Sequence, residues 1–259
     1  EHVEINSKEI NESIQYAKRI QASILPPIQR LEDGFLDSFV YYEPKDVVSG
    51  DFYWYEKIKN NPLFAVVDCT GHGVPGAFMS IIGYTQLNEI VTQQKITDPS
   101  AILRELDKRV RTALNQNSMN DKNSKDGMEL GLIHVDRSQN RLEFAGAMRP
   151  LYLVRKGELE IVKGSKFSIG GISLREKEFT TTHIDILPGD AVYVFSDGYP
   201  DQFGGPNGKK FMTRNVADML RNIAHLPMAE QEKVIKQTIK KWMKNEEQVD
   251  DILICGIKF

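Results

Sequence analysis

Four stretches of the sequence place aspartates at the edge of an apolar, β-rich run. Asp68 follows FAVV, Asp51 begins DFYWY, Asp197 follows VYVFS, and Asp250 with Asp251 precedes ILICGI. A single aspartate beside glycine is usually a turn former that bonds the local backbone. Acids at the ends of several central strands are instead expected to converge on one rim of a sandwich. There, two carboxylates 4 Å apart repel by about 4 kcal/mol at an effective dielectric constant of 20.

Such a group of carboxylates needs cations. Ligation by carboxylates, backbone carbonyls and water selects magnesium, manganese or calcium, whereas zinc prefers histidine or cysteine. We therefore infer two divalent cations, Mg²⁺ or Mn²⁺. Two such ions about 3.5 to 4 Å apart, bridged by one carboxylate, polarise a phosphoryl oxygen and activate a water molecule for in-line attack, without a protein nucleophile.

The chain after Asp68 turns sharply and enters a predicted helix. Gly71 and Gly73 flank His72 at this turn, where glycine lets the backbone approach closely. The sequence leaves two roles open for His72. It is either a general acid that protonates the leaving oxygen or a helix-start histidine bonded to the turn.

The spacing of apolar residues predicts the elements that position these side chains. Amphipathic patterns predict helices over 74–92, 99–114, 211–224 and 228–244, with Phe78 among the core-facing residues. Short β-rich runs separated by Gly, Asn, Asp and Pro predict strands over 38–42, 51–58, 63–67, 129–135, 142–146, 151–154, 158–162, 180–186, 191–195 and 252–257. Grouped strands with helices inserted between the groups favour an α+β layered sandwich over a parallel βαβ sheet.

One domain, residues 29–259, is expected to follow a leading helix, residues 1–28, because no boundary signal divides the longer part. The polar stretch 115–126 is expected to be a mobile loop. The leading helix carries one stripe formed by Val3, Ser7, Ile10, Ile14, Ala17, Gln21 and Ile24. This stripe indicates either a dimerising, signal-carrying helix that forms a homodimer or a helix packed on its own domain.

Composition limits the classes of partner. The 259 residues include 33 basic and 36 acidic side chains, and the net charge of −3 gives no reason to expect nucleic acid or an anionic membrane. Cys69 and Cys255 cannot form a disulfide framework, which fits a reducing, cytoplasmic compartment. No run approaches the about 20 apolar residues of a membrane span, so direct membrane insertion is not expected. The chain begins without Met, and we expect further N-terminal domains, through which the parent protein is able to attach to a membrane.

The motifs SGDFYW, DCTGHGVPGAFM, FAGAMRPLYLV, SDGYPDQ and VDDILICG occur in an order and spacing that resemble the metal-dependent serine/threonine protein phosphatases, the PPM family. They are most similar to its bacterial SpoIIE/RsbU branch, and RIQASILPP resembles that branch's lead-in helix. The resemblance covers nearly the whole chain. It implies an αββα four-layer sandwich of two mainly antiparallel sheets, with the metals in a cleft at one edge.

Carried over position by position, the resemblance implies a dinuclear site. Asp68 resembles the ligand that bridges the two ions, and the backbone carbonyl of Cys69 occupies a position that contacts one of them. Asp51 resembles a ligand of that same ion, directly or through water. Asp197 resembles a ligand of the other ion.

Two further positions stay open from the sequence. Asp250 also resembles a ligand of the second ion, and Asp251 either orients its neighbour or substitutes for it. Met148 and Arg149 stand where the branch often shows Gly-His. Arg149 is expected either to hold the substrate phosphate bidentately or to be a solvated surface arginine.

The resemblance implies hydrolysis of phosphoserine or phosphothreonine on a regulatory protein by metal-activated water. In this branch the phosphoprotein is often a STAS-type anti-sigma-factor antagonist, and the phosphatase is the output domain of a larger signalling protein. One alternative is a catalytically inactive PPM-fold regulatory or dimerisation module, although all the ligand positions are acidic. A calcium-binding β-sandwich is a weaker alternative, because it would show repeated acidic loops.

Overall fold

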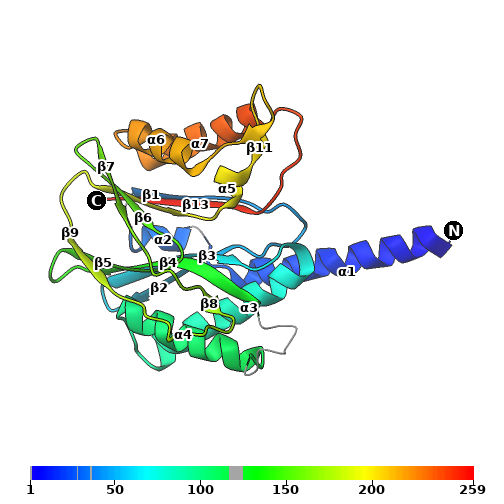
Figure 1. Ribbon diagram of the computed structural model, residues 1–259, viewed down its shortest axis with the longest axis horizontal. Coiled ribbons are helices and arrows are strands. Elements are labelled where there is room, and N and C mark those ends of the chain that lie inside the picture. The colour runs from blue at the N-terminus through cyan, green and yellow to red at the C-terminus, as the bar shows by residue number, and fades with distance from the viewer. Residues whose placement is uncertain (1, 28, 36, 117–124) are drawn as a thin grey trace.

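Two antiparallel β-sheets pack face to face, and helices cover the outer face of each sheet (Figure 1). The computed structural model describes residues 2–27, 29–35, 37–116 and 125–259. Most of the loop expected at 115–126 lies outside the described residues. The four layers confirm the αββα sandwich expected for the chain.

The first sheet has the strand order β1-β13-β10-β6-β7, and every neighbouring pair is antiparallel. Its strands are β1 (Asp37–Glu43), β6 (Leu151–Arg155), β7 (Glu158–Val162), β10 (Ala191–Phe195) and β13 (Ile252–Lys258). Because β13 runs antiparallel beside β10, the residues that precede β13 lie next to those that follow β10.

The second sheet has the order β2-β3-β4-β5-β9, and β8 pairs with the start of β4. Its strands are β2 (Phe52–Ile58), β3 (Asn61–Cys69), β4 (Gly127–Asp136), β5 (Arg141–Ala147), β8 (Ile169–Gly170) and β9 (Thr182–Asp185). A short separate ribbon joins β11 (Phe203–Gly204) to β12 (Lys209–Lys210).

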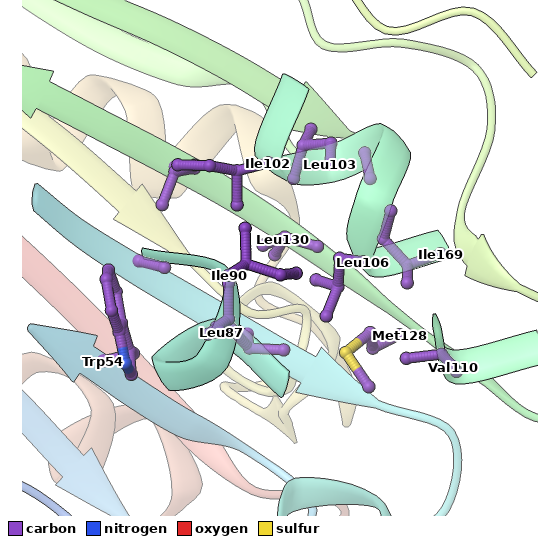
Figure 2. Packing of buried hydrophobic residues seen from close by; sticks show 14 of the residues in the cluster. Trp54, Leu87, Ile90, Ile102, Leu103, Leu106, Val110, Met128, Leu130 and Ile169 are labelled. Atoms are coloured by element: carbon purple, nitrogen blue, oxygen red, sulfur yellow. The ribbon is translucent and has the colours of Figure 1, made fainter. Parts of the chain in front are cut away.

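Helices cover the outer face of each sheet and complete its core. The helices are α1 (His2–Ile24), α2 (Gln29–Glu32), α3 (Gly73–Asn88), the π-helix η1 (Glu89–Gln93), α4 (Pro99–Ala113), α5 (Gly198–Asp201), α6 (Thr213–Ile223) and α7 (Met228–Met243). Figure 2 shows the layer under α3 and α4, where Leu87, Ile102 and Leu106 meet Trp54 and Leu130 of the second sheet. The buried run of β3 belongs to a sheet covered on both faces, as its continuous apolar sequence predicts.

Small residues bring part of α3 close to the sheet. Gly76, Ala77 and Gly83 are buried, and a Cβ at Gly83 would lie 2.9 Å from the ring of Phe52. The expectation that Phe78 faces the core is wrong, because other positions, among them Met79 and Leu87, form the buried face of α3. The Phe78 side chain is 65% exposed.

Among the α1 side chains that the structure describes, those toward the C-terminal end pack on the domain, where Gln21 is buried and Ile24 is half-buried. The rest of α1 extends away from the sandwich (Figure 1), and Ile10 is 61% exposed there. Within the described residues, no helix is long and apolar enough to cross a membrane.

A buried lysine fixes the chain between β7 and β9 onto α4. Lys177 Nζ donates to Asp107 Oδ1 at 2.7 Å and to the carbonyl oxygens of Ser168, at 2.9 Å, and Gly170. Asp107 Oδ1 also accepts from the Gly170 amide at 2.9 Å. These bonds hold residues 163–178, here called the β7–β9 segment, against the helix layer.

Candidate metal-binding site

The register of the second sheet sets three acids side by side. Asp68 lies directly opposite Glu129 of β4. The pairing of Phe52 with Val67, continued by one residue, places Asp51 opposite Asp68 on the other side. Directly opposite residues of an antiparallel pair share one face of the sheet. Three neighbouring strands therefore deliver three carboxylates to the same edge.

The first sheet delivers the remaining acids to that edge. The Ser196 amide donates to the carbonyl of Leu253 at 2.9 Å, so Asp197 follows β10 where Asp250 and Asp251 approach β13. A Cβ at Gly198 would lie 1.9 Å from the carbonyl oxygen of Asp251, so the close crossing of these segments requires glycine.

The acids meet in an open pocket of about 340 Å³. Its lining residues are Asp68, Cys69, Thr70, Gly71, Lys125, Gly127, Met128, Glu129, Arg149, Ser168, Asp197 and Asp250. The structure thus brings together Asp68, Asp197 and Asp250, with Cys69 at the end of β3. Asp51 lies behind them, and neither it nor His72 is part of the lining.

Asp51 is a buried acid with an unpaired oxygen. Its Oδ2 has no hydrogen-bond partner among the described residues, and its side chain is almost fully buried. Burial, followed by the charge of Asp68, raises the pKa of Asp51 well above its ordinary value. An orphaned carboxylate oxygen of this kind calls for a cation.

Asp68 forms an ion pair with Arg149. Arg149 Nη2 donates to Asp68 Oδ2 at 2.5 Å and to Asp197 Oδ2 at 3.1 Å, and it lies 3.0 Å from Glu129 Oε2. Burial raises the pKa of Asp68 to about 7, although the Arg149 charge opposes this shift. Arg149 is therefore a pocket residue held by three carboxylates, and the sequence-based alternative of a solvated surface arginine is wrong.

Asp250 and Asp251 face different partners. Asp251 Oδ1 accepts from the Lys45 amide and Oδ2 from the Gly50 amide, both at 2.8 Å, so backbone donors occupy both oxygens. Asp250 lines the pocket, and burial raises its pKa although the Asp251 amide donates to Oδ1. Among the described residues no hydrogen bond reaches Asp250 Oδ2, while Asp251 ties the segment before Asp51 to the start of β13.

His72 lies at the rim and bonds away from the pocket lining. Its Nδ1 is 2.7 Å from Asp46 Oδ2, and its Nε2 is 3.1 Å from Lys45 Nζ. Because the lysine ammonium only donates, Nε2 accepts and Nδ1–H donates to Asp46. This arrangement matches a helix-start histidine that holds residues 45 and 46.

The donor set fits hard divalent cations. The pocket and the space behind it supply carboxylate oxygens and the Cys69 carbonyl, and the Asp51 oxygen is unpaired. Within the described ranges, no three His, Cys, Asp or Glu side chains already stand in a ligating arrangement. The Arg149 guanidinium contacts both Asp68 and Asp197.

Comparison with known proteins decides the family. The family model described as Stage II sporulation protein E (SpoIIE) matches residues 59–259. The chain belongs to the SpoIIE family. It is similar to the phosphoserine phosphatase RsbU of Bacillus subtilis (strain 168), at 25% identity over 196 residues, covering 74% of this chain and 54% of RsbU. The chain thus spans about half the length of that relative.

Solved structures confirm the PP2C fold of this SpoIIE-family domain. The SiaA-PP2C domain of Pseudomonas aeruginosa matches with a TM-score of 0.87 and 35% identity over 98% of both chains. The PP2C phosphatase domain of SpoIIE from Bacillus subtilis, solved with a fragment of its regulatory domain, matches with a TM-score of 0.67 and 17% identity. That alignment covers 86% of this chain and 63% of the other. The chain is a PP2C-type phosphatase domain of the SpoIIE/RsbU branch.

Two site residues of this SpoIIE-family domain were missed by the sequence reasoning. Glu129 sits within a β-rich run, MELGLIHV, and only its pairing with Asp68 brings it to the pocket. Gln21 belongs to α1, yet its Nε2 donates to the Ser49 carbonyl at 2.6 Å, and its Oε1 accepts from the Ser49 amide at 3.1 Å. The signal available in the sequence was that Gln21 is a polar residue within the mainly apolar stripe of the leading helix.

Gln21 is expected to hold the Asp51 segment in place. Ser49 Oγ accepts from the Asp51 amide at 3.0 Å. Gln21 of α1 therefore supports the buried Asp51 through Ser49, which lies between them. Gln21→Ala should raise the Mn²⁺ concentration at half-maximal binding about tenfold, as loss of an outer support of a ligand does. Isothermal titration calorimetry measures this, with the exposed Gln15→Ala on α1 as control. Equal affinities for the parent and Gln21→Ala would show that α1 gives no support.

Separate substitutions of the two adjacent acids should distinguish their roles. Asp251→Asn replaces an acceptor of a backbone N–H by an amide donor, and we expect about 2 kcal/mol less free energy of unfolding without metal. Asp250→Asn should leave that free energy within about 0.5 kcal/mol and weaken Mn²⁺ binding. Urea unfolding in EDTA and calorimetry measure the two effects. The reverse pattern would make Asp251 the ligand.

Proposed function

We propose that this domain hydrolyses phosphoserine or phosphothreonine on a protein, with Mn²⁺ or Mg²⁺ bound at the acidic pocket. The observation that carries the proposal is the convergence of Asp68, Asp197 and Asp250 on one pocket, with the unpaired oxygen of Asp51 behind them. The family membership supports the same reaction. Convergent carboxylates at the edge of a sandwich have no evident structural use, because they repel one another.

The chain's own residues divide the work of holding two cations. Asp68 lies between the two groups of acids and would contact both ions. Asp51 and the Cys69 carbonyl would hold one ion, and Asp197 with Asp250 the other. When bound, the cations supply a polarised phosphoryl oxygen and an activated water molecule.

Arg149 and His72 have distinct parts in this proposal. Arg149 contacts Asp68, Asp197 and Glu129, so its guanidinium lies in the pocket that the phosphate would enter, which supports a role in binding it. We assign phosphate binding to Arg149. His72 is assigned to positioning the segment at Asp46, rather than to protonating the leaving oxygen.

The proposed substrate is a small phosphorylated regulatory protein of the STAS-type anti-sigma-factor antagonist class. Support comes from the branch: the relative RsbU is named a phosphoserine phosphatase. We propose that this domain is the output part of a larger signalling protein, and that residues 1–28 link it to the preceding part.

Metal-dependent phosphate release tests the proposed function. The parent should release phosphate from a phosphoserine protein in Mn²⁺, and EDTA should abolish the release. The same assay separates the proposal from a catalytically inactive regulatory module, which would bind the phosphoprotein without turnover. Activity that is unaffected by EDTA would refute the dinuclear site.

We also propose that α1 mediates a homodimer. Its projecting part exposes Ile10 and Tyr16, which are 61% and 59% exposed, and Phe78 is exposed on α3, the helix that α1 packs against. Ile10→Glu with Tyr16→Glu should shift the sedimentation coefficient of a dimeric parent to that of a monomer. A parent that sediments as a monomer would remove this proposal.

A further inference from the structure

A second hollow adjoins the acidic pocket. It has a volume of about 370 Å³ and is here called the docking groove. Its lining residues are Lys125, Glu129, Met148, Lys166, Phe167, Ser168, Gly170, Gly171, Ile172, Ser173 and Lys177. Lys125, Glu129 and Ser168 line the acidic pocket as well. The two hollows are therefore neighbours, and a chain whose phosphate enters the pocket has the docking groove beside it.

The docking groove has a firmly held wall. Ser165 donates its amide to the Gly146 carbonyl at 2.7 Å and accepts the Met148 amide at 2.9 Å, which joins the β7–β9 segment to the end of β5. Lys177 fastens the other end of that segment to α4. Because both ends are bonded, the groove is present before any partner binds.

Met148 presents an apolar side chain in the docking groove. Its φ is 65°, a left-handed conformation that a residue with a Cβ rarely adopts. The hydrogen bond from the Met148 amide to the Ser165 carbonyl and the β-bridge with Leu130 hold it in this conformation. The Met148 side chain is 48% exposed, and it lies with the half-buried Phe167 in the same lining. Methionine adapts its shape to varied partner side chains.

The free charges of the docking groove are positive. Lys125 and Lys166 are exposed, and neither forms an ion pair within the described part of the chain. Lys177 is already neutralised by Asp107. Glu129 is the one carboxylate among the described lining residues, and it pairs with Arg149 at 3.0 Å. A cationic groove thus borders an anionic pocket.

We propose that the docking groove binds the polypeptide on one side of the substrate's phosphorylated serine or threonine and selects acidic side chains there. Lys125 and Lys166 would pair with those carboxylates, and Met148 and Phe167 would contact apolar atoms between them. The charge complementarity favours an acidic segment over a basic one. This inference rests on the proposed phosphatase function and adds a sequence preference to it.

Two phosphoserine peptides test the preference. They differ only in glutamate or glutamine at the positions flanking the phosphoserine, and kcat/KM is measured in Mn²⁺ at low ionic strength. The variants are Lys125→Gln, Lys166→Gln and the double variant, with the exposed Lys241→Gln of α7 as a matched control. Turnover of p-nitrophenyl phosphate, which is too small to reach the groove, reports the intact catalytic pocket.

The parent should prefer the glutamate peptide, and each lysine variant should lower kcat/KM for that peptide by up to about fivefold, the range of an exposed ion pair. The preference should fade near about 1 M salt, where exposed charges are screened. Lys241→Gln should match the parent, and p-nitrophenyl phosphate turnover should be equal in the parent, Lys166→Gln and Lys241→Gln. For the two variants of Lys125, which also lines the acidic pocket, the readout is the ratio of kcat/KM between the two peptides.

The outcomes separate this inference from the function on which it rests. A parent that hydrolyses p-nitrophenyl phosphate and treats both peptides alike overturns the docking proposal alone. So does a double variant that keeps the preference for glutamate. Failure of the parent to hydrolyse p-nitrophenyl phosphate in Mn²⁺ overturns the proposed phosphatase function instead.

Discussion

Asp68→Asn is expected to lower kcat for a phosphoserine substrate at least about 10³-fold, because the stabilisation of the transition state by a bound cation is worth several kcal/mol. Asp68 lies opposite both Glu129 and the position of Asp51 in the second sheet, and its Oδ2 is 3.4 Å from the Asp197 amide nitrogen, which follows β10 of the first sheet. Asparagine keeps the shape and one acceptor for Arg149 but removes the charge that would hold the cations. Phosphate release at saturating Mn²⁺ measures the decrease.

Stability in the absence of metal distinguishes lost chemistry from lost folding. Burial raises the pKa of Asp68 to about 7, so the folded metal-free protein disfavours the ionised form. Asp68→Asn should therefore unfold in EDTA at a temperature no lower than that of the parent. Asp201→Asn is the matched control, because Asp201 is exposed and pairs with Lys210 at 2.9 Å. An active Asp68→Asn protein would refute the assigned bridging role.

Lys177→Met is expected to lower the free energy of unfolding by about 3 to 5 kcal/mol, the usual effect of removing one partner of a buried ion pair. The ammonium is almost fully buried and lies 2.7 Å from Asp107 Oδ1. Its removal leaves Asp107 with the Gly170 amide and with Arg111 at 3.9 Å. Thermal unfolding should shift downward by about 10 °C.

A double substitution tests the cause of this destabilisation. In Asp107→Leu with Lys177→Met, both charges are gone, so the double variant should be more stable than Lys177→Met alone. Lys241→Met, on the exposed side of α7, should unfold at the same temperature as the parent. A Lys177→Met protein as stable as the parent would show that the β7–β9 segment needs no buried anchor.

The position of Arg149 explains how one pocket accommodates several acids before cations bind. The guanidinium touches Asp68, Asp197 and Glu129, and these three charges raise the Arg149 pKa despite its burial. A planar group with several donors is suited to such a position, and the same donors suit phosphate. The positive charge of Arg149 thereby offsets the repulsion among the three carboxylates in the folded protein.

The proposed docking groove would let the domain distinguish substrate sequences, which the carboxylates of the acidic pocket cannot do. With cations bound, the proposed site would recognise a phosphate through charge and would treat many phosphoserines alike. Lys125, Lys166 and Met148 lie where the chain beside the phosphate must pass. The two proposals together assign discrimination among substrates to the β7–β9 segment and its neighbours, and the chemistry to the strand ends.

The sequence by itself determined the order of the long strands and helices and the acids that end the strands, but not the short elements α2, α5, β8, β11 and β12. Local periodicity suffices for this, because a buried strand reads as an apolar run wherever it lies. The strand predicted over 191–195 matches β10, and the helix predicted over 228–244 matches α7 within one residue. Asp51, Asp68 and Asp197 were visible as acids beside such runs.

Only the tertiary structure decided what each acid touches. Asp250 and Asp251 are adjacent in sequence, and their different roles follow from the Lys45 and Gly50 amides, about 200 residues away along the chain. Arg149 reaches Asp68 across 81 residues. Pairing register and long-range hydrogen bonds are properties of strands that meet in space, and no local pattern encodes them.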